Sequence, residues 1–272
     1  MMTQTHKNPI PVSARDEAKD SSFFDLKHNS NSAEVSVFTS GDRMSKLYKL
    51  DSNGALQKTP GGQLIRGHYE RHSCPRPSDL ADLIQTLDTN QALAYGTAKE
   101  KTAPIASRKA AGDGDITRTR DHFDWNPGPG WLMLDYDPDK ASDPLDRAGL
   151  MDLIAEAWPD IVDAPSVVGD SGTSHIYNVE TGEQVKGRGG LRLYVLVADA
   201  RDIKRAGDTL HQRLWLAGHG YFAVSKSGAL LNRSPVDAAV WQPERLDFAA
   251  GAACGEPLEQ RRPAPEVRND DA

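Results

Sequence analysis

The chain of 272 residues has few of the features that mark membrane proteins, secreted proteins or disulfide-rich scaffolds. No run approaches the roughly 20 apolar residues that a membrane-spanning helix needs, which excludes an integral membrane protein. The N-terminal stretch has no apolar core of the kind a signal peptide carries, so we expect no secretion. Only two cysteines, Cys74 and Cys254, are present, too few for a disulfide framework or a four-thiolate zinc site. We therefore expect a cytoplasmic protein.

The chain also lacks an excess of positive charge. Its formal net charge is −7 at pH 7, whereas proteins that coat nucleic acid are usually basic. A local basic groove is still compatible with this charge, and one cationic stretch holds Lys99, Lys101, Arg108, Lys109, Arg118 and Arg120. The sequence contains no GxxxxGK[ST] segment, so helicase or ATPase activity would have to come from another domain or protein.

What the sequence does contain is an alternation of strand-like and helix-like segments. Alternating or short unbroken apolar runs between turn residues predict strands at residues 33–39, 91–95, 131–134, 166–168, 191–197, 221–224 and 239–241. Amphipathic periodicity predicts helices at residues 79–87, 145–158 and 203–217, the first of them capped by Ser78. Several connections are too short for a crossover helix, so we expect an α/β (α+β) fold with an antiparallel or mixed sheet.

Other parts of the chain lack periodicity. Residues 1–32 are polar and predict a flexible N-terminal tail, and the Pro-rich, charged residues 256–272 predict a disordered tail or a linker. Residues 97–116 carry Gly, Lys and Ala without an apolar stripe and predict a loop. Two turn signals between residues 46 and 69 indicate a meander of strands.

The strongest local signal is an apolar run that ends in two aspartates. Residues 131–134 are all apolar, which is typical of a central strand covered on both faces, and Asp135-Tyr136-Asp137 follows. Residues i and i+2 of a strand point to the same side, so both carboxylates would project together. Such a pair repels unless a cation lies between its members, and oxygen-only ligation suits Mg²⁺ or Mn²⁺. Alternatively, both aspartates cap the turn and the helix that follows.

A DxD pair after a strand occurs in several unrelated enzyme classes. A haloacid-dehalogenase-type phosphatase would need Thr or Val where Asp139 stands, whereas a metal-dependent glycosyltransferase remains an alternative. The segment Gly169-Asp170-Ser171-Gly172 matches the nucleophile segment of trypsin-like proteases, but no Ala-His-Cys segment precedes it and the α/β pattern is wrong for paired β-barrels.

Three segments in a fixed order carry a family resemblance. WLMLDYDPD comes first, PSVVGDSGTSHIYN with GRGGLRLYVLVAD follows, and LLNRSPVDAAVWQPERLDF comes last. This order resembles the archaeo-eukaryotic primase superfamily, especially the primase-polymerases of phages, plasmids and integrated mobile elements. The resemblance covers residues 33–255 and implies a two-unit primase-polymerase core. Its N-terminal unit would span residues 33–115, and a catalytic unit with an RNA-recognition-motif-like (RRM-like) sheet would span residues 116–255.

The resemblance also implies an activity and its ligands. The expected function is a DNA primase-polymerase that joins ribo- or deoxynucleoside triphosphates on a single-stranded DNA template, with a helicase supplied by another domain or protein as a candidate partner. By the family's pattern, Asp135, Asp137 and Asp237 would hold two Mg²⁺ or Mn²⁺ ions, which clamp the attacking oxygen and the triphosphate. Without that pattern, Asp237 would be interpreted as the cap of a turn or helix.

The phosphate-binding residues have two interpretations in this sequence. Thr173-Ser174-His175 fits the family's motif of a small residue, any residue and His, whereas Arg192 stands where that His often lies on a strand after glycines. Residues 178–188 would then be an inserted hairpin that divides the motif. Arg192 could equally be the partner of a structural ion pair. The remaining candidates for contacts with nucleotide are Ser171, Ser174, Lys226 and Arg233.

A rival from another class is a replication-associated DNA-binding module without catalysis. It predicts DNA binding that persists when the aspartates are replaced, with no polymer made. A glycosyltransferase would turn over nucleotide sugars and would not need Asp237.

Overall fold

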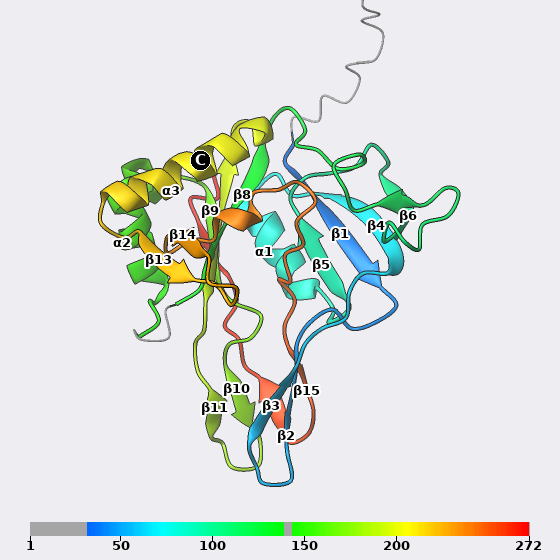
Figure 1. Ribbon diagram of the computed structural model, residues 1–272, viewed down its shortest axis with the longest axis vertical. Helices are drawn as coiled ribbons and strands as arrows, with labels where there is room; N and C mark the ends of the chain where they lie inside the picture. The colour runs from blue at the N-terminus through cyan, green and yellow to red at the C-terminus, as the bar shows by residue number, and fades with distance from the viewer. Residues whose placement is uncertain (1–31, 139–142, 272) are drawn as a thin grey trace, which may run out of the picture.

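The computed structural model of the chain describes residues 32–138 and 143–271. It is a mixed α/β protein with several sheets, as the sequence pattern predicts (Figure 1). The N-terminal tail predicted for residues 1–32 lies outside the described residues except for Ser32. Among the described residues, no helix is long and apolar enough to cross a membrane.

The N-terminal part forms a five-stranded sheet. Its order is β5 (Gln91–Ala94), β1 (Glu34–Ser40), β4 (Arg66–Ser73), β6 (Thr102–Ala106) and β7 (Ile116–Thr117). The loop predicted for residues 97–116 is therefore wrong in part, because it contains β6 and the first residue of β7. The alternation in β6 rests on small residues and is interrupted by a proline, which makes it invisible as an apolar stripe. Main-chain pairing with β4 fixes β6 instead.

Helix α1 (Pro77–Thr86) follows β4. Its N-cap is Arg76, whose backbone N–H donates to Asp79 Oδ2 at 3.0 Å. The predicted Ser78 cap is therefore wrong. Proline is well tolerated in the first turn, where its missing N–H has no helical partner, and this moves the helix start upstream of the serine. The apolar face predicted for this helix is confirmed, since Leu80 and Ile84 are buried.

The central sheet has four strands and positions the candidate site. Its order is β17 (Glu266–Arg268), β9 (Ser166–Asp170), β12 (Leu191–Val197) and β8 (Gly130–Tyr136), with every neighbouring pair antiparallel. Residues 131–134 are fully or almost fully buried, which confirms the prediction of a strand covered on both faces. The predicted central position is wrong, because β8 is the last strand in the order of this sheet.

Helices cover one face of the central sheet. Helix α2 (Arg147–Ala157) starts at its N-cap Asp146 and connects β8 to β9, and α3 (Ile203–Leu216) follows β12. Both lie on one side of β8 and β9 in Figure 1, whereas α1 and the five-stranded sheet lie on the other. Buried side chains from both sheets and all three helices form one apolar core, which joins the two parts of the molecule.

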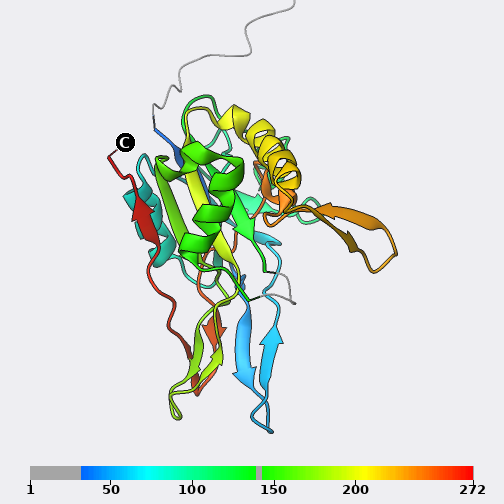
Figure 2. The ribbon, with the colours of Figure 1, turned by 90° about the vertical axis from the view of Figure 1, so that its left-hand side faces the viewer.

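Smaller sheets extend from this body. At the lower end in Figure 1, β2 (Leu47–Leu50) pairs with β3 (Leu56–Thr59) and β15 (Ala253–Cys254). Beside them, β10 (Ile176–Asn178) pairs with β11 (Gln184–Lys186), which confirms a hairpin near the predicted insertion, and with β16 (Leu258–Gln260). The β13–β14 hairpin (Tyr221–Val224 and Leu230–Arg233) projects from the body in Figure 2.

Two further predictions need correction. Residues 239–241 are not a strand, because Ala238–Val240 form a 3-10 helix whose N-cap is Asp237. Residues 256–272 were expected to be a disordered tail or linker, yet β16 and β17 pair with β10 and β9. These strands are only three residues long and mostly polar, and they are held by free strand edges rather than by an apolar stripe, which no periodicity could reveal.

Candidate functional site

The end of β8 places Asp135 opposite a cation. In the antiparallel register, Asp135 pairs with Arg192 of β12, and Arg192 pairs with Gly169 of β9. Directly opposed residues of antiparallel strands point to the same face. Asp135 and Arg192 therefore share the face of the central sheet that lies toward the five-stranded sheet.

Arg192 is held mainly by a carboxylate that sequence reasoning missed. Its Nε lies 2.8 Å from Asp247 Oδ1 and 3.7 Å from Asp135 Oδ1. Burial by itself would lower the pKa of Arg192, but Asp247 and then Asp135 outweigh burial and raise it above its ordinary value. Arg192 is thus a permanently charged group between two carboxylates. The geometry around Arg192 is that of a structural ion pair, which is one of its two interpretations. One of its carboxylate partners, Asp135, is also a candidate metal ligand.

Asp247 is the centre of a buried polar network. Its side chain has 0% exposure, and Oδ2 accepts hydrogen bonds from the hydroxyls of Tyr95 at 2.7 Å and Tyr194 at 2.8 Å. The only sequence signal for Asp247 is a single acid between the apolar residues Leu246 and Phe248, which is too common a pattern to single out a site.

Asp237 reaches the same place from far along the chain. Its backbone N–H donates to the Asp135 carbonyl at 2.9 Å, and Val236 forms an antiparallel bridge with Tyr136. The Asp237 carboxylate accepts from the backbone N–H of Ala239 at 3.1 Å and from Arg233 Nη1 at 3.3 Å. Asp237 therefore caps the short 3-10 helix, as the capping interpretation predicts, and this cap lies beside Asp135.

Asp137 lies beyond the end of β8 and is exposed. A Cβ on Gly190 would lie 2.3 Å from the Tyr136 carbonyl and 2.9 Å from Asp137 Oδ1, so only glycine permits this close approach. Burial raises the pKa of Asp135 to about 6; Arg192 opposes this, and Asp137, Asp247 and Asp237 add to it. The cluster therefore holds more negative charge than Arg192 neutralises.

A cavity of about 300 Å³ opens over these residues. Its polar lining residues are Arg118, Asp135, Arg192, Asp237, Arg245 and Asp247, whereas Asp137 is not among them. Within residues 32–138 and 143–271, no three His, Cys, Asp or Glu side chains come close enough to form a metal cage. The cavity wall does bring together two partly exposed carboxylates, Asp135 and Asp237. Mg²⁺ is often held by one or two carboxylates, with water and substrate phosphates as the other ligands.

A larger groove of about 710 Å³ continues from this cavity. The two share Arg118, Leu246 and Phe248 as lining residues. The groove adds Arg108 and Arg120, from the cationic stretch noted in the sequence, and Glu244. Arg118 donates to the Glu244 carbonyl at 2.8 Å, and burial lowers its pKa. A path lined by arginines therefore leads to the carboxylates.

His175 belongs to a different cluster. Its Nε2 lies 3.6 Å from Asp170 Oδ2, and Asp170 also contacts Arg147 at 3.0 Å and Arg188 at 3.6 Å. Asp170 is opposite Leu191, so the register places it on the other face of the sheet from Asp135 and Arg192. The structure thus separates the two phosphate candidates, His175 and Arg192, which the sequence treated as halves of one motif.

The turn between β9 and His175 carries a group of neighbouring hydroxyls. Ser171 Oγ lies 3.2 Å from Thr173 Oγ1 and 3.2 Å from Ser174 Oγ, and Ser174 Oγ accepts from the Gly189 N–H at 2.9 Å. His175 has a φ of 59°, an uncommon left-handed conformation for a residue other than glycine. Ser171 and Ser174 are buried, and their hydroxyls contact each other, Thr173 and the backbone of Gly189.

The remaining cationic candidates lie on or near the projecting hairpin. Arg233 ends β14 and contacts Asp237, so it lies beside the carboxylates. Lys226 lies in the turn of the hairpin, is exposed and does not line the cavity. An unpredicted cation, Lys46, is closer to the cluster: burial lowers its pKa, as does Lys58, whereas Asp137 raises it.

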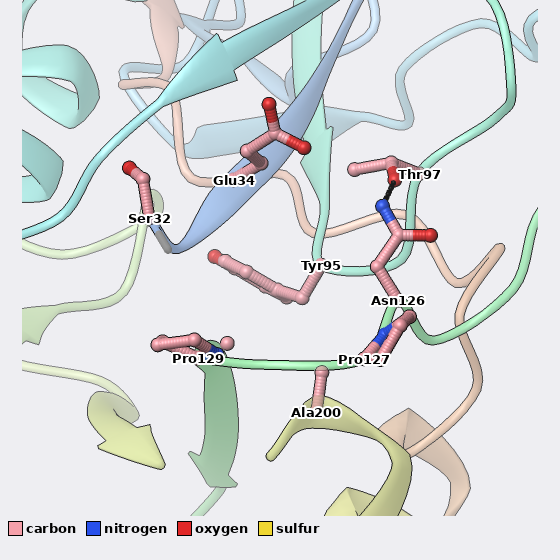
Figure 3. Close-up of a pocket in the computed structure, with 9 residues that line it drawn as sticks. Ser32, Glu34, Tyr95, Thr97, Asn126, Pro127, Pro129 and Ala200 are labelled. Carbon is pink, nitrogen blue, oxygen red and sulfur yellow. Dashed lines mark hydrogen bonds between the residues drawn. The ribbon is translucent and has the colours of Figure 1, made fainter. Parts of the chain in front are cut away.

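A third hollow, shown in Figure 3, is too small for a substrate. Its volume of about 10 Å³ is that of roughly one water molecule. Glu34, Tyr95, Thr97 and Asn126 line it, and Asn126 is hydrogen-bonded to Thr97. Tyr95 belongs both to the lining of this hollow and to the Asp247 network.

No family model, curated protein or solved structure matches the chain.

Proposed function

We propose that this chain is a primase-polymerase that transfers nucleotidyl groups from nucleoside triphosphates onto a growing strand, directed by a single-stranded DNA template. The observation that carries the proposal is the meeting of Asp135 and Asp237 at one cavity with Arg192 on the adjacent strand. These residues come from the three segments whose order resembles the archaeo-eukaryotic primase superfamily. A chance cap at residue 237 would not need to lie beside Asp135.

The order of elements supports the proposed fold of the catalytic unit. Apart from the β10–β11 hairpin, the chain runs β8, α2, β9, β12, α3, and β12 lies between β8 and β9. An RRM-like sheet would have this strand arrangement, with a further strand on the outer side of β8, where Val236 forms a bridge. The active carboxylates would then lie at the end of the first strand of that unit.

The donor chemistry fits divalent cations. Asp135 and Asp237 line the cavity, and the raised pKa of Asp135 reflects burial plus neighbouring negative charge, which a cation would relieve. Asp135 and Asp237 would hold Mg²⁺ or Mn²⁺ from the cavity wall, and Asp137, which is exposed at the strand end outside the cavity lining, would join them only by turning toward the ion. When bound, two such ions supply charge neutralisation at the attacking 3′-oxygen and the leaving pyrophosphate. Arg192 would bind the triphosphate, because Asp247 and Asp135 raise its pKa and keep it charged. Lys46, which lies near Asp137, would be a second cation beside it.

The groove lined by Arg108, Arg118 and Arg120 supports a nucleic-acid partner. Arginines contact phosphates whatever the sequence, and Phe248, which is 40% exposed, offers a ring on which a base can stack. The groove shares residues with the cavity, so a bound template would be delivered to the carboxylates. A DxD glycosyltransferase gives no reason for this groove or for Asp237.

The experiment that tests the proposal is primer synthesis in solution. The protein is incubated with single-stranded DNA, labelled ATP or dATP and Mn²⁺, and the products are sized. Wild type and the control Asp152→Asn, on the exposed side of α2, should make polymer, and Asp135→Asn should not. DNA binding without polymer from wild type would favour the non-catalytic module, and turnover of a nucleotide sugar would favour the glycosyltransferase.

A further inference from the structure

The Asp247 carboxylate is fixed in place by the N-terminal part of the molecule. Its backbone forms two hydrogen bonds with Leu93 of β5, at 2.7 and 2.9 Å. Tyr95, which follows β5, donates to Oδ2, and so does Tyr194 of β12. Burial raises the pKa of both tyrosines well above the ordinary value, so both remain protonated donors. With Oδ2 occupied by two donors, Oδ1 is the atom that faces Arg192.

The contact with Asp247 controls how Arg192 is presented. Arg192 Nε lies 2.8 Å from Asp247 Oδ1, although neither atom makes a hydrogen bond within the described part of the chain. Nη1 donates to the Phe248 carbonyl at 3.5 Å. A guanidinium has five N–H donors, so these two contacts leave donors for an anion that enters the cavity. Arg192 lines that cavity.

Asp247 also decides which charge Arg192 satisfies. Asp135 Oδ1 lies 3.7 Å from the same Nε and is the nearest alternative partner. Without the Asp247 carboxylate, Arg192 would pair with Asp135 alone, because a buried guanidinium requires a counter-charge. A carboxylate that neutralises Arg192 is a poorer ligand for a cation. The Asp247 carboxylate, at 2.8 Å from Arg192 Nε, therefore keeps Asp135 available.

We propose that Asp247, oriented by Tyr95 and Tyr194, is a positioning residue that holds Arg192 toward the anionic substrate and keeps Asp135 free for the cation. This inference rests on the proposed function. The position of Arg192 then depends on contact between the two sheets. Leu93 and Tyr95 lie in or next to the five-stranded sheet, whereas Arg192 lies in the central sheet. If the network were purely structural, disrupting it would lower stability without changing the affinity for the cation or for the anionic substrate.

The test measures ligand binding separately from turnover. Mn²⁺ binding is followed by electron paramagnetic resonance and ATP binding by calorimetry, each beside a thermal melt. The decisive variant is Tyr95→Phe, which removes one hydrogen bond and no charge, and its matched control is Tyr221→Phe on the exposed hairpin. We expect Tyr95→Phe to weaken ATP binding about fivefold, since a hydrogen bond to a charged group is lost, while Tyr221→Phe matches wild type.

Asp247→Asn should weaken the binding of both Mn²⁺ and ATP by about tenfold or more, as expected for loss of a buried charge partner. The double variant Arg192→Gln/Asp247→Asn should regain melting temperature and Mn²⁺ affinity but not ATP affinity. Variants that melt lower with unchanged affinities would overturn the positioning role and leave the proposed function intact. A wild type that binds neither Mn²⁺ nor ATP would overturn the proposed function, and this inference with it.

Discussion

Two charged clusters lie at the same end of the central sheet, one on each face. The first brings Asp135 and Asp247 together at Arg192 and places Asp237, which contacts Arg233, at the same cavity. The second gathers Arg147, Arg188 and His175 around one aspartate, Asp170, whose side chain is 2% exposed. The first brings several carboxylates together beside an open cavity, whereas the second surrounds a single buried acid with basic side chains.

This difference indicates which cluster would bind a ligand and which cluster stabilises the fold. In the second cluster, the single acid contacts two arginines and a histidine and connects α2, β9 and the β10–β11 region. In the first, Asp135 lies near other carboxylates, and burial together with their charge leaves Asp135 with a raised pKa. Like charges kept together at a cost in stability are typical of sites that bind a ligand of opposite charge.

The largest expected difference between the clusters is in reaction rate. Asp135→Asn should lower primer synthesis by on the order of a thousandfold, because a metal ligand is lost. We expect Asp137→Ala to abolish synthesis as well, and Asp237→Asn to weaken metal affinity more than stability. Product sizing under saturating Mn²⁺ checks this, with Asp152→Asn as control. Near-normal extension by Asp135→Asn would contradict the metal-binding role of the first cluster.

The second cluster should respond in stability instead. Asp170→Asn leaves Arg147 and Arg188 without their shared counter-charge, and breaking a buried ion pair costs about 3 kcal/mol. Urea unfolding monitored by tryptophan fluorescence measures this loss. Replacing an exposed paired acid, as in Asp208→Asn, provides the control and should change little. A variant that keeps its stability but loses ATP affinity would make the second cluster a binding site.

Stability should also depend on pH through Asp135. Its folded pKa, raised to about 6, lies above the ordinary value near 3.8. The folded state therefore binds the proton more tightly than the unfolded state does. This contribution is fully present below about pH 4 and is lost as the pH rises through 6. Above pH 6, Asp135→Asn should be more stable than wild type by on the order of 2 kcal/mol, with a difference that narrows toward pH 4.

Chemical denaturation of both proteins at several pH values measures this difference. Added Mn²⁺ should stabilise wild type more at pH 7 than at pH 5, since the ion competes with the proton for Asp135. A constant difference between the two proteins from pH 4 to pH 8 would contradict the raised pKa.

The smallest effect is expected in the groove beside the first cluster. Arg118→Gln removes one cation and should weaken binding of single-stranded DNA about threefold to tenfold, with a salt dependence reduced by about one phosphate contact. Fluorescence anisotropy at several salt concentrations checks this, and Arg201→Gln, in an exposed pair with Asp199, is the matched control. Equal effects of both variants would show that only net charge matters and that the groove is no specific path.

The sequence by itself determined the elements on which the first cluster depends. The buried run at residues 131–134 identified the covered strand and placed Asp135 at its end, because only a strand covered on both faces is apolar at every position. The apolar segment at residues 191–197 identified the strand that carries Arg192. These are consequences of local periodicity, which a single chain segment carries.

Only the tertiary structure decided which charges meet. Asp247 faces Arg192 because its backbone is bridged to β5, a contact between segments that are distant in sequence. His175 was separated from Arg192 because the pairing of β9 with β12 puts Asp170 on the opposite face. The strands β16 and β17 form because free sheet edges accept their main-chain hydrogen bonds, which ordinary side-chain patterns do not encode. Register and long-range pairing, not residue type, set these contacts.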